Sequence, residues 1–202
     1  IGFEPFEYRY HPRIRGRARL FRRSRWLGAR GSAIEWSRRQ RLLLDSLKVH
    51  AYHAYTDWWK RFHRVHPEYF ALQPDWTREP ISKPSTVKMC VSNPAFREQW
   101  LDDVEAQLAA NPNQVMFSAS PNDGGYSGFC ICEDCRGWDH PDGKTVGLHW
   151  QGVGQHYVSL TDRYVTFANT LVRLLQERYP DRNLLVGMYA YGAHRLPPVG
   201  VK

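Results

Sequence analysis

Residues 114–125 read QVMFSASPNDGG, an apolar run that ends abruptly in a small polar cluster. The run predicts a short buried strand, and its Pro, Asn, Asp and Gly residues predict a turn directly after it. In open and barrel-shaped α/β proteins, the carboxyl ends of parallel strands carry the chemistry. We therefore expect Asn122 and Asp123 to lie at the carboxyl edge of a sheet, where they are candidate catalytic residues.

Apolar runs at residues 87–92 and 184–191 predict further strands that are covered on both faces, as parallel strands are. Helical patterns alternate with them. Asn93-Pro94 marks the start of a helix whose apolar residues recur at every fourth position. A second long helix is expected from about residue 159 to residue 179, and a Gly-rich loop is expected over residues 137–154.

The alternation of strand and helix predicts a parallel α/β fold. Residues 6–10 and 48–55 add two possible strands, which gives about five β/α units. A complete (β/α)₈ barrel typically needs roughly 250 residues, and the chain has 202. We therefore expect a partial (β/α)₈ TIM-type barrel, and a complete open sheet of about five strands is the alternative.

The formal charge of +8 is concentrated at the front of the chain, in arginines between Arg13 and Arg41. We expect residues 1–31 to form an Arg-rich N-terminal segment with a possible first strand, and residues 32–202 to form the barrel domain. The boundary is set by Ser32 and Glu35, which have the spacing of a helix capping box. Such arginines can neutralise phosphates, but no DNA- or RNA-reading motif accompanies them, so nucleic acid is not the expected partner.

The composition is that of an ordinary globular protein, with 42% hydrophobic and 14% aromatic residues. No apolar stretch approaches the roughly 18 residues that a membrane span needs, so no span is expected. The first residue is Ile1, and no signal peptide is visible in the chain.

The chain has four cysteines: Cys90, Cys130, Cys132 and Cys135. Four thiolates can close a tetrahedral structural Zn²⁺ site, although the spacing differs from that of paired Cys-x2-Cys knuckles. Two disulfides are the alternative in an exported protein, but Cys130 and Cys132 are too close to bridge each other comfortably. We expect structural zinc as a metal cofactor, and no cofactor for catalysis.

Five polar or aromatic residues near the ends of predicted strands are candidates for substrate binding: His50, His53, Asn93, Tyr189 and Tyr191. Histidines at such a rim could bind sugar hydroxyls, while tyrosines could stack on a pyranose ring. For each of these residues a position in the core is an equally good explanation.

An ordered set of motifs resembles the bacterial domain of unknown function 4838 over about residues 34–198. The motifs are HPEYFAL at 66–72, MCVSNP at 89–94, SPNDGG at 120–125, C-x-C-x-x-C at 130–135, and DRY at 162–164 through YPD at 179–181. That grouping is similar to glycoside hydrolase family 163, endo-acting β-N-acetylglucosaminidases on a (β/α)₈ barrel. The resemblance implies a carbohydrate-active, exported bacterial protein.

Cleavage of a glycosidic bond usually needs two carboxyl groups, or one carboxyl group and the acetamido group of the substrate. With the resemblance, we expect a glycoside hydrolase-like protein acting on N-acetylglucosamine-containing glycans. Asp123 would be the acid/base or the acetamido-orienting carboxylate, and Asn122 could orient a substrate amide. Simple turn chemistry also explains these residues. A zinc-stabilised nucleic-acid-binding module and a non-catalytic carbohydrate-binding relative are the alternative functions.

Overall fold

The computed structural model describes residues 52–124, 128–150 and 153–201. These residues all fall within one compact unit of the chain, Val49–Lys202. The Arg-rich segment 1–31, the strand expected at residues 6–10, the helix expected from Ser32 and the domain boundary before it lie outside the described residues.

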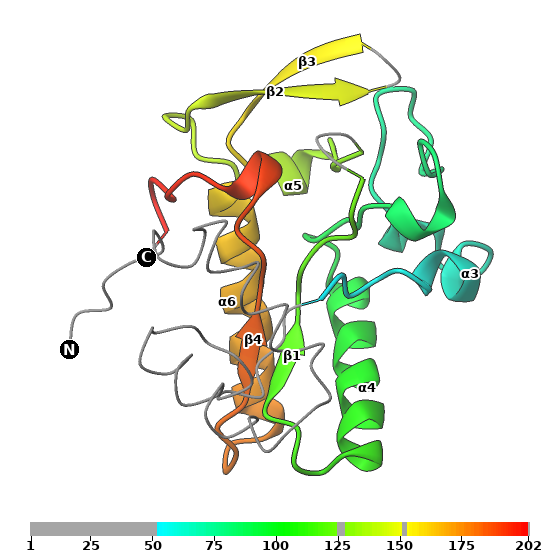
Figure 1. Ribbon diagram of the computed structural model, residues 1–202, viewed down its shortest axis with the longest axis vertical. Coiled ribbons are helices and arrows are strands. Elements are labelled where there is room, and N and C mark those ends of the chain that lie inside the picture. Colours follow the sequence, from blue (N-terminus) through cyan, green and yellow to red (C-terminus); the bar gives the residue numbers. More distant parts are fainter. Residues whose placement is uncertain (1–51, 125–127, 151–152, 202) are drawn as a thin grey trace, which may run out of the picture. The chain divides into compact units, whose positions relative to one another are not determined.

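A parallel pair of short strands lies at the centre of this unit (Figure 1). β1 (Met116–Ser118) pairs with β4 (Leu185–Gly187) from Met116 opposite Leu185 to Ser118 opposite Gly187. Just beyond β1, a parallel bridge joins Ser120 to His53 on the opposite edge of the strand. The buried strand expected at residues 115–120 is therefore confirmed, and it is the middle one of three parallel segments.

Two long helices lie alongside this strand pair (Figure 1): α4 (Pro94–Ala110) and α6 (Thr161–Arg178). Both expected helices are confirmed to within two residues. Each helix buries an apolar stripe with helical spacing, which includes Phe96, Trp100, Val104 and Leu108 in α4, and Tyr164, Phe167, Leu171 and Leu175 in α6. Burial of each large apolar side chain contributes about 1.5–3 kcal/mol. No helix among the described residues is both long and apolar enough to cross a membrane.

The start of α4 is fixed by the side chain of Asn93. Its Oδ1 accepts hydrogen bonds from the backbone N–H groups of Ala95 at 2.8 Å and Phe96 at 3.3 Å. Pro94 takes the first helical position, where no N–H group is needed. The Asn93 Nδ2 atom donates to the carbonyl of Glu68 at 3.0 Å, so the same side chain also ties the helix to a preceding loop.

An aromatic cluster packs beneath α4, around the side chain of Trp58. It draws on α3 (Trp58–Phe62) and on the 3₁₀ turn η2 (Pro67–Tyr69). The Trp58 ring lies 5.2 Å from that of Tyr55, at 88°, and 5.2 Å from that of Phe96, at 68°. Such edge-to-face contacts add to the burial of the rings, and Trp58 is only 1% exposed.

The segment at residues 87–92 is buried from 87 to 91, as predicted, but the expected parallel strand is wrong: in the described structure the segment forms only an isolated antiparallel bridge. It follows the 3₁₀ turn η3 (Pro84–Thr86). Its backbone bonds go to an antiparallel neighbour, residues 69–71, with a bridge between Phe70 and Met89. The pairing places both of these apolar side chains in the core, where Phe70 is 0% and Met89 2% exposed.

The prediction of a loop over residues 137–154 is wrong in its second half. An antiparallel hairpin is present, formed by β2 (Thr145–Trp150) and β3 (Val153–Val158), with Thr145 opposite Val158. Glycines weaken the strand pattern in a sequence. The hydrogen bonds of an antiparallel ladder come from the backbone, and so glycines do not prevent them.

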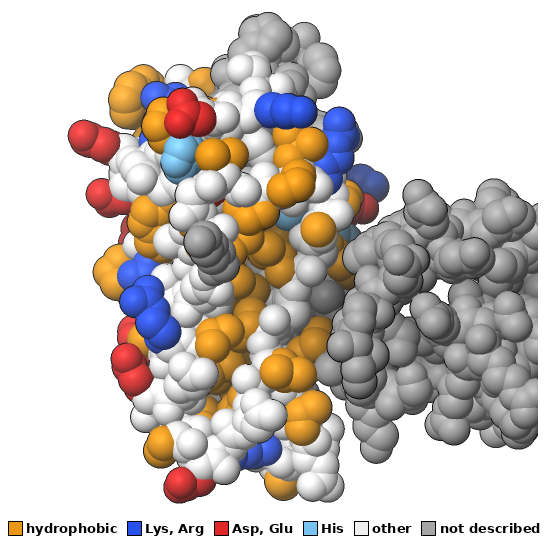
Figure 2. Space-filling view, turned by 90° about the vertical axis from the view of Figure 1, so that its left-hand side faces the viewer, with side chains coloured by type: hydrophobic (Ala, Val, Ile, Leu, Met, Phe, Trp, Pro, Cys, Tyr) orange, Lys and Arg blue, Asp and Glu red, His pale blue; other side chains and the backbone are white. Residues whose placement is uncertain are grey.

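β4 is less buried than the apolar run at residues 184–191 predicts. Leu185 is 45% exposed and Tyr189 is 38% exposed. Figure 2 shows apolar side chains gathered along one face of the molecule, with charged side chains toward its margins. Among the described residues, β4 pairs only with β1. The partial (β/α)₈ barrel of about five units stays a prediction.

We predict that Asn93→Ala lowers the free energy of unfolding by about 1 kcal/mol or more, because two N–H groups of α4 lose their capping acceptor. Urea unfolding measures the change. Asn113→Ala, in the exposed turn after α4, is the matched control and should change stability by less than about 0.5 kcal/mol. Equal losses of stability in the two variants would show that the Asn93 cap does not stabilise the protein.

Candidate functional site

The carboxyl end of β1 is held by a fully buried amide, that of Asn122. Its Oδ1 accepts from the backbone N–H of Tyr55 at 3.0 Å, and its Nδ2 donates to the carbonyls of Tyr55 at 2.8 Å and Val87 at 2.9 Å. Both amide N–H groups are therefore used by the backbone. The Asn122 side chain therefore links its own segment to the segments at Tyr55 and Val87 by hydrogen bonds. Its expected role toward a substrate stays a prediction.

Asp123 directly follows Asn122 in the chain and is exposed. Its Oδ1 accepts from the N–H of Gly124 at 2.9 Å. The carboxylate also forms a hydrogen bond with the hydroxyl of Tyr191; burial, then the negative charge of Asp123 and this bond, raise the pKa of Tyr191. Because Tyr191 follows β4, the ends of β1 and β4 meet at the Asp123 carboxylate.

A buried lysine lies behind Asp123. Lys88 is 2% exposed, and its Nζ donates to the carbonyls of Asn122 and Asp123, the latter at 2.8 Å. Nζ is also 5.3 Å from the centre of the Phe129 ring, within the range of a cation–π contact. Burial lowers the pKa of Lys88 to about 8, although the charge of Asp123 opposes this shift.

Three aromatic rings lie together, and one of them is that of Tyr191, the hydrogen-bond partner of Asp123. The His53 ring lies 5.4 Å from that of Tyr189 and 6.3 Å from that of Tyr191, and the two tyrosine rings are 6.0 Å apart. His53 Nδ1 is 2.8 Å from the carbonyl of Pro121. A carbonyl only accepts, so Nδ1 donates this hydrogen bond. We call Asp123, Lys88, His53, Tyr189 and Tyr191 the strand-end site.

A buried histidine, His194, packs against the ring of Tyr191. His194, in the 3₁₀ turn η4 (Gly192–His194), is 3% exposed, and its ring lies 4.8 Å from that of Tyr164. Within the described residues, neither of its ring nitrogens makes a hydrogen bond of normal geometry. Burial lowers the pKa of His194 to about 4; the backbone of Tyr189 opposes the shift.

The second cluster consists of the four cysteines, which we call the thiol cluster. The Sγ atoms of Cys90, Cys130, Cys132 and Cys135 all lie within 4.8 Å of one another, and none of them forms a disulfide. Cys132 and Cys135 are placed by the short helix α5 (Glu133–Arg136), which Cys132 precedes. The loop that contains α5 is thereby brought against the end of the segment that carries Cys90.

Donors surround these sulfur atoms. The N–H of Leu72 donates to Cys130 Sγ at 3.3 Å, and the N–H of Cys135 donates to Cys132 Sγ at 3.4 Å. The hydroxyl of Ser92 lies 3.0 Å from Cys135 Sγ. Groups of this kind stabilise the negative charge of thiolates, as outer ligands do around protein-bound metals.

Mutual hydrogen bonds push the thiol pKa values apart. The bond from Cys130 lowers the pKa of Cys132 to about 6 and lowers that of Cys90, while the pKa of Cys130 itself is raised. Four thiolates this close repel one another, so full ionisation requires a cation between them. The thiol cluster has the number, type and spacing of ligands that can hold a metal ion.

Comparison with known proteins places the chain. A family model, described as domain of unknown function (DUF4838), matches residues 5–202. The chain belongs to this family. No curated protein and no solved structure matches it. Both the strand-end site and the thiol cluster lie in the matched region of this DUF4838 chain.

The structure brings together four of the residues that the sequence singled out: Asp123, His53, Tyr189 and Tyr191. Asn93 is engaged in capping α4, at the other end of the segment that carries Lys88. His50 lies outside the described residues. For all of them, a role in binding a substrate stays a prediction.

Two residues of this DUF4838 chain were missed by the sequence analysis: Lys88 and His194. The signal for Lys88 was available, because a single charged residue interrupts the apolar run at 87–91. Charged residues are almost never fully buried unless they have partners. No comparable signal marks His194, since its burial depends on contacts with α6 and with the segment after β4.

We predict that low pH destabilises the protein through His194. The unfolded chain binds a proton near pH 6.5 and the folded chain only near pH 4, so stability is present above pH 6.5 and is lost as the pH falls toward 4. The free energy of unfolding, measured in urea, should fall relative to that of His194→Phe by up to about 1.4 kcal/mol per pH unit in this window. His63→Phe, which replaces a partly exposed histidine, is the control. If the free energies of unfolding of the wild type and of His194→Phe differ by the same amount at every pH, the prediction is contradicted.

Proposed function

We propose that this DUF4838 chain belongs to a glycoside hydrolase-like enzyme that acts on N-acetylglucosamine-containing glycans, with the strand-end site as its active site. One observation carries the proposal. The carboxylate of Asp123, at the carboxyl end of β1, is hydrogen-bonded to Tyr191 from the end of β4, and the Tyr191 ring lies against those of His53 and Tyr189.

The chemistry assigned to Asp123 follows from its surroundings. Cleavage of a glycosidic bond needs a carboxyl group beside the scissile bond, with either a second carboxyl group or the acetamido group of the substrate as its partner. The hydroxyl of Tyr191 fixes the orientation of the Asp123 carboxylate. Asp123 would then act as the acid/base or as the carboxylate that orients the acetamido group.

The aromatic residues supply the binding surface in this proposal. Tyr189 is more than one-third exposed, and Tyr191 and His53 are partly exposed. Tyrosine rings offer an apolar face to the C–H groups of a sugar, and their hydroxyls bind its polar groups. The second ring nitrogen of His53, Nε2, could form a hydrogen bond with a sugar hydroxyl.

The partial (β/α)₈ barrel and export from the cell are part of the same proposal. Enzymes with this fold place their active sites at the carboxyl ends of the strands, which is where Asp123 and Tyr191 lie. The resemblance of the sequence motifs to glycoside hydrolase family 163 implies the same assignment. The alternative of a nucleic-acid-binding module depends on arginines at residues 13–41, all of which lie outside the described residues.

The thiol cluster is proposed to bind one structural Zn²⁺. Cys90 Sγ lies 3.7 Å from Cys132 Sγ and 3.8 Å from Cys135 Sγ. Zn–S bonds of about 2.3 Å give a tetrahedron with edges of about 3.8 Å, whereas a disulfide needs about 2.05 Å. Four protein ligands leave no open position, and the bound ion would hold the loop at residues 130–136 in place.

We predict that Asp123→Asn lowers kcat/KM by at least about 100-fold, since removal of a general acid or base typically has effects of this size. Release of sugar from an N-acetylglucosamine-containing glycan by the full-length protein is the measurement. Asp181→Asn, an exposed residue after α6, is the matched control. Glycan binding without release supports a non-catalytic relative, and salt-sensitive DNA binding without release supports the nucleic-acid alternative.

For the metal, we expect one zinc ion per chain by elemental analysis of the purified protein. Cys132→Ser removes a ligand, and should abolish zinc binding and lower the free energy of unfolding by at least about 2.7 kcal/mol, the value for a ligand present at 100 times its Kd. Thiol titration in denaturant gives an independent readout, because zinc leaves four free thiols. No metal and no free thiols would establish two disulfides.

A further inference from the structure

The buried side chain of Lys88 takes no part in the proposed acid/base chemistry, and its presence needs an explanation. Lys88 is 2% exposed and lies in the otherwise apolar segment at residues 87–91. Burial of a cation is costly unless its partners replace the lost hydration. A charge that is buried at such a cost beneath a candidate active site indicates a role in that site rather than in folding.

The partners of the Lys88 ammonium group are two consecutive backbone carbonyls. Nζ donates to the carbonyl oxygens of Asn122 and Asp123, the latter at 2.8 Å. Hydrogen bonds from a charged donor are roughly twice as strong as those between neutral groups. The lysine therefore restrains the backbone on both sides of the Asp123 α-carbon, because the first carbonyl precedes this atom and the second follows it.

This restraint determines the direction of the Asp123 side chain. The backbone has only two soft dihedrals per residue, φ and ψ. With the peptide group on each side of Asp123 bound to Lys88, both dihedrals are limited, and with them the direction of the Cα–Cβ bond. Gly124, the next residue, has φ +115° and belongs to the least restricted residue type. The residue after Asp123 thus adds little stiffness to the turn, and the lysine supplies it instead.

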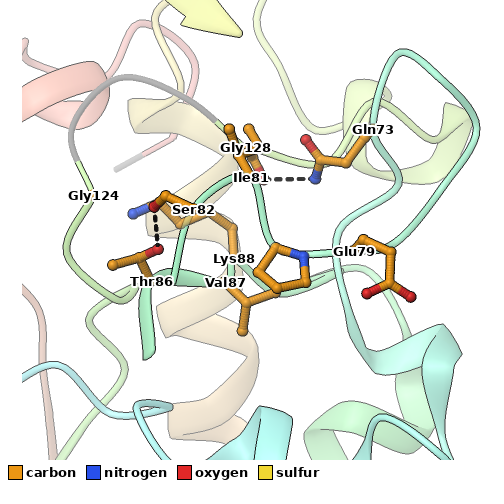
Figure 3. A pocket seen from close by; sticks show the side chains of 10 residues that line it. Gln73, Glu79, Ile81, Ser82, Thr86, Val87, Lys88, Gly124 and Gly128 are labelled. Atoms are coloured by element: carbon orange, nitrogen blue, oxygen red, sulfur yellow. Dashed lines mark hydrogen bonds between the residues drawn. The ribbon is translucent and has the colours of Figure 1, made fainter. Parts of the chain in front are cut away.

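Lys88 is itself fixed by its surroundings. Its backbone carbonyl accepts from the N–H of Ala71 at 3.0 Å. Its Nζ lies 5.3 Å from the centre of the buried Phe129 ring, within the range of a cation–π contact. Figure 3 shows the Lys88 side chain extending from this anchored segment toward the segment of Gly124. A side chain that is held at both ends can determine the position of its partners.

We propose that Lys88 is a positioning residue of the strand-end site, an assignment that rests on the proposed function. Its ammonium group holds the peptide groups before and after Asp123, and so orients the carboxylate toward the hydroxyl of Tyr191 and toward the substrate. Lys88 itself does not touch the substrate in this arrangement, because its side chain is buried. Its effect on the reaction passes through the position of Asp123.

Three substitutions separate the charge of Lys88 from its packing. Lys88→Met keeps an unbranched apolar side chain and removes the ammonium group, and Lys88→Gln takes its place if the methionine variant does not fold. Lys88→Arg keeps a positively charged donor on a larger side chain. Lys83→Met is the matched control, because Lys83 lies in the same stretch of chain and is exposed. Thermal unfolding verifies that each variant folds.

The first measurement is the kinetics of sugar release from an N-acetylglucosamine-containing glycan by the full-length protein. Lys88→Met should lower kcat at least about tenfold and change KM less than about threefold, because a small displacement of a reacting group can cost about 100-fold in rate. Lys88→Arg should retain at least about one-third of the wild-type kcat, and Lys83→Met should stay within about twofold of it. A role in packing alone predicts the opposite order, since methionine suits a buried site better than arginine.

The second measurement does not depend on activity. Crystal structures of the wild type, Lys88→Met and Lys88→Arg give the distance between the Asp123 carboxylate and the Tyr191 hydroxyl. We expect the hydrogen bond between these groups in the wild type and in Lys88→Arg. In Lys88→Met it should be lost, because the two peptide groups that flank Asp123 no longer have their charged donor.

An Asp123 carboxylate that keeps its bond to Tyr191 in Lys88→Met, or a kcat that is lower in Lys88→Arg than in Lys88→Met, overturns the positioning role. Glycan cleavage by the wild type separates this result from failure of the proposed function. A wild type that cleaves glycans, with a kcat that Lys88→Met leaves unchanged, refutes the role of Lys88 alone. A wild type that cleaves no glycan refutes the hydrolase, and loss of the Asp123–Tyr191 bond in Lys88→Met then supports the positioning role by itself.

Discussion

The buried amide of Asn122 is the interaction on which the strand-end site depends. The side-chain amide bonds to the backbone of Tyr55 and Val87, and the backbone carbonyl of Asn122 accepts from Lys88. The three segments that it joins are far apart in sequence, and their buried backbone groups would otherwise lack partners. Because the amide satisfies them in a single arrangement, it also determines where the carboxylate of Asp123 emerges.

The thiol cluster imposes a second constraint, an electrostatic one. Four sulfur ligands within 4.8 Å of one another hold the loop at residues 130–136 against Cys90. Nearby, Arg163 is buried, donates to the carbonyl of Cys130 at 2.8 Å and forms an ion pair with Asp139. A cation in the cluster would neutralise part of the thiolate charge, and Arg163 ties the same loop to α6. The loop is thus connected to the Cys90 segment by the clustered sulfur atoms and to α6 by the charge of Arg163.

Local signals predicted the helices well and the strands less well. The Asn93 cap and the apolar periodicity of α4 are properties of neighbouring residues, and therefore the sequence contains them directly. The segment at residues 87–92 was recognised as buried, but its antiparallel partner at residues 69–71 was not. The hairpin of β2 and β3 was missed because its glycines conceal the alternation that identifies strands.

By itself, the sequence determined the covered helices, the end of β1 before Asp123 and the set of four cysteines, because each depends on residues close together or on residue type alone. Only the tertiary structure decided that Tyr191 meets Asp123 and that Lys88 is buried behind it. The physical reason is that burial and hydrogen-bond partners arise from contacts between distant segments. A one-dimensional pattern records how apolar a residue is, but not which atoms will surround it.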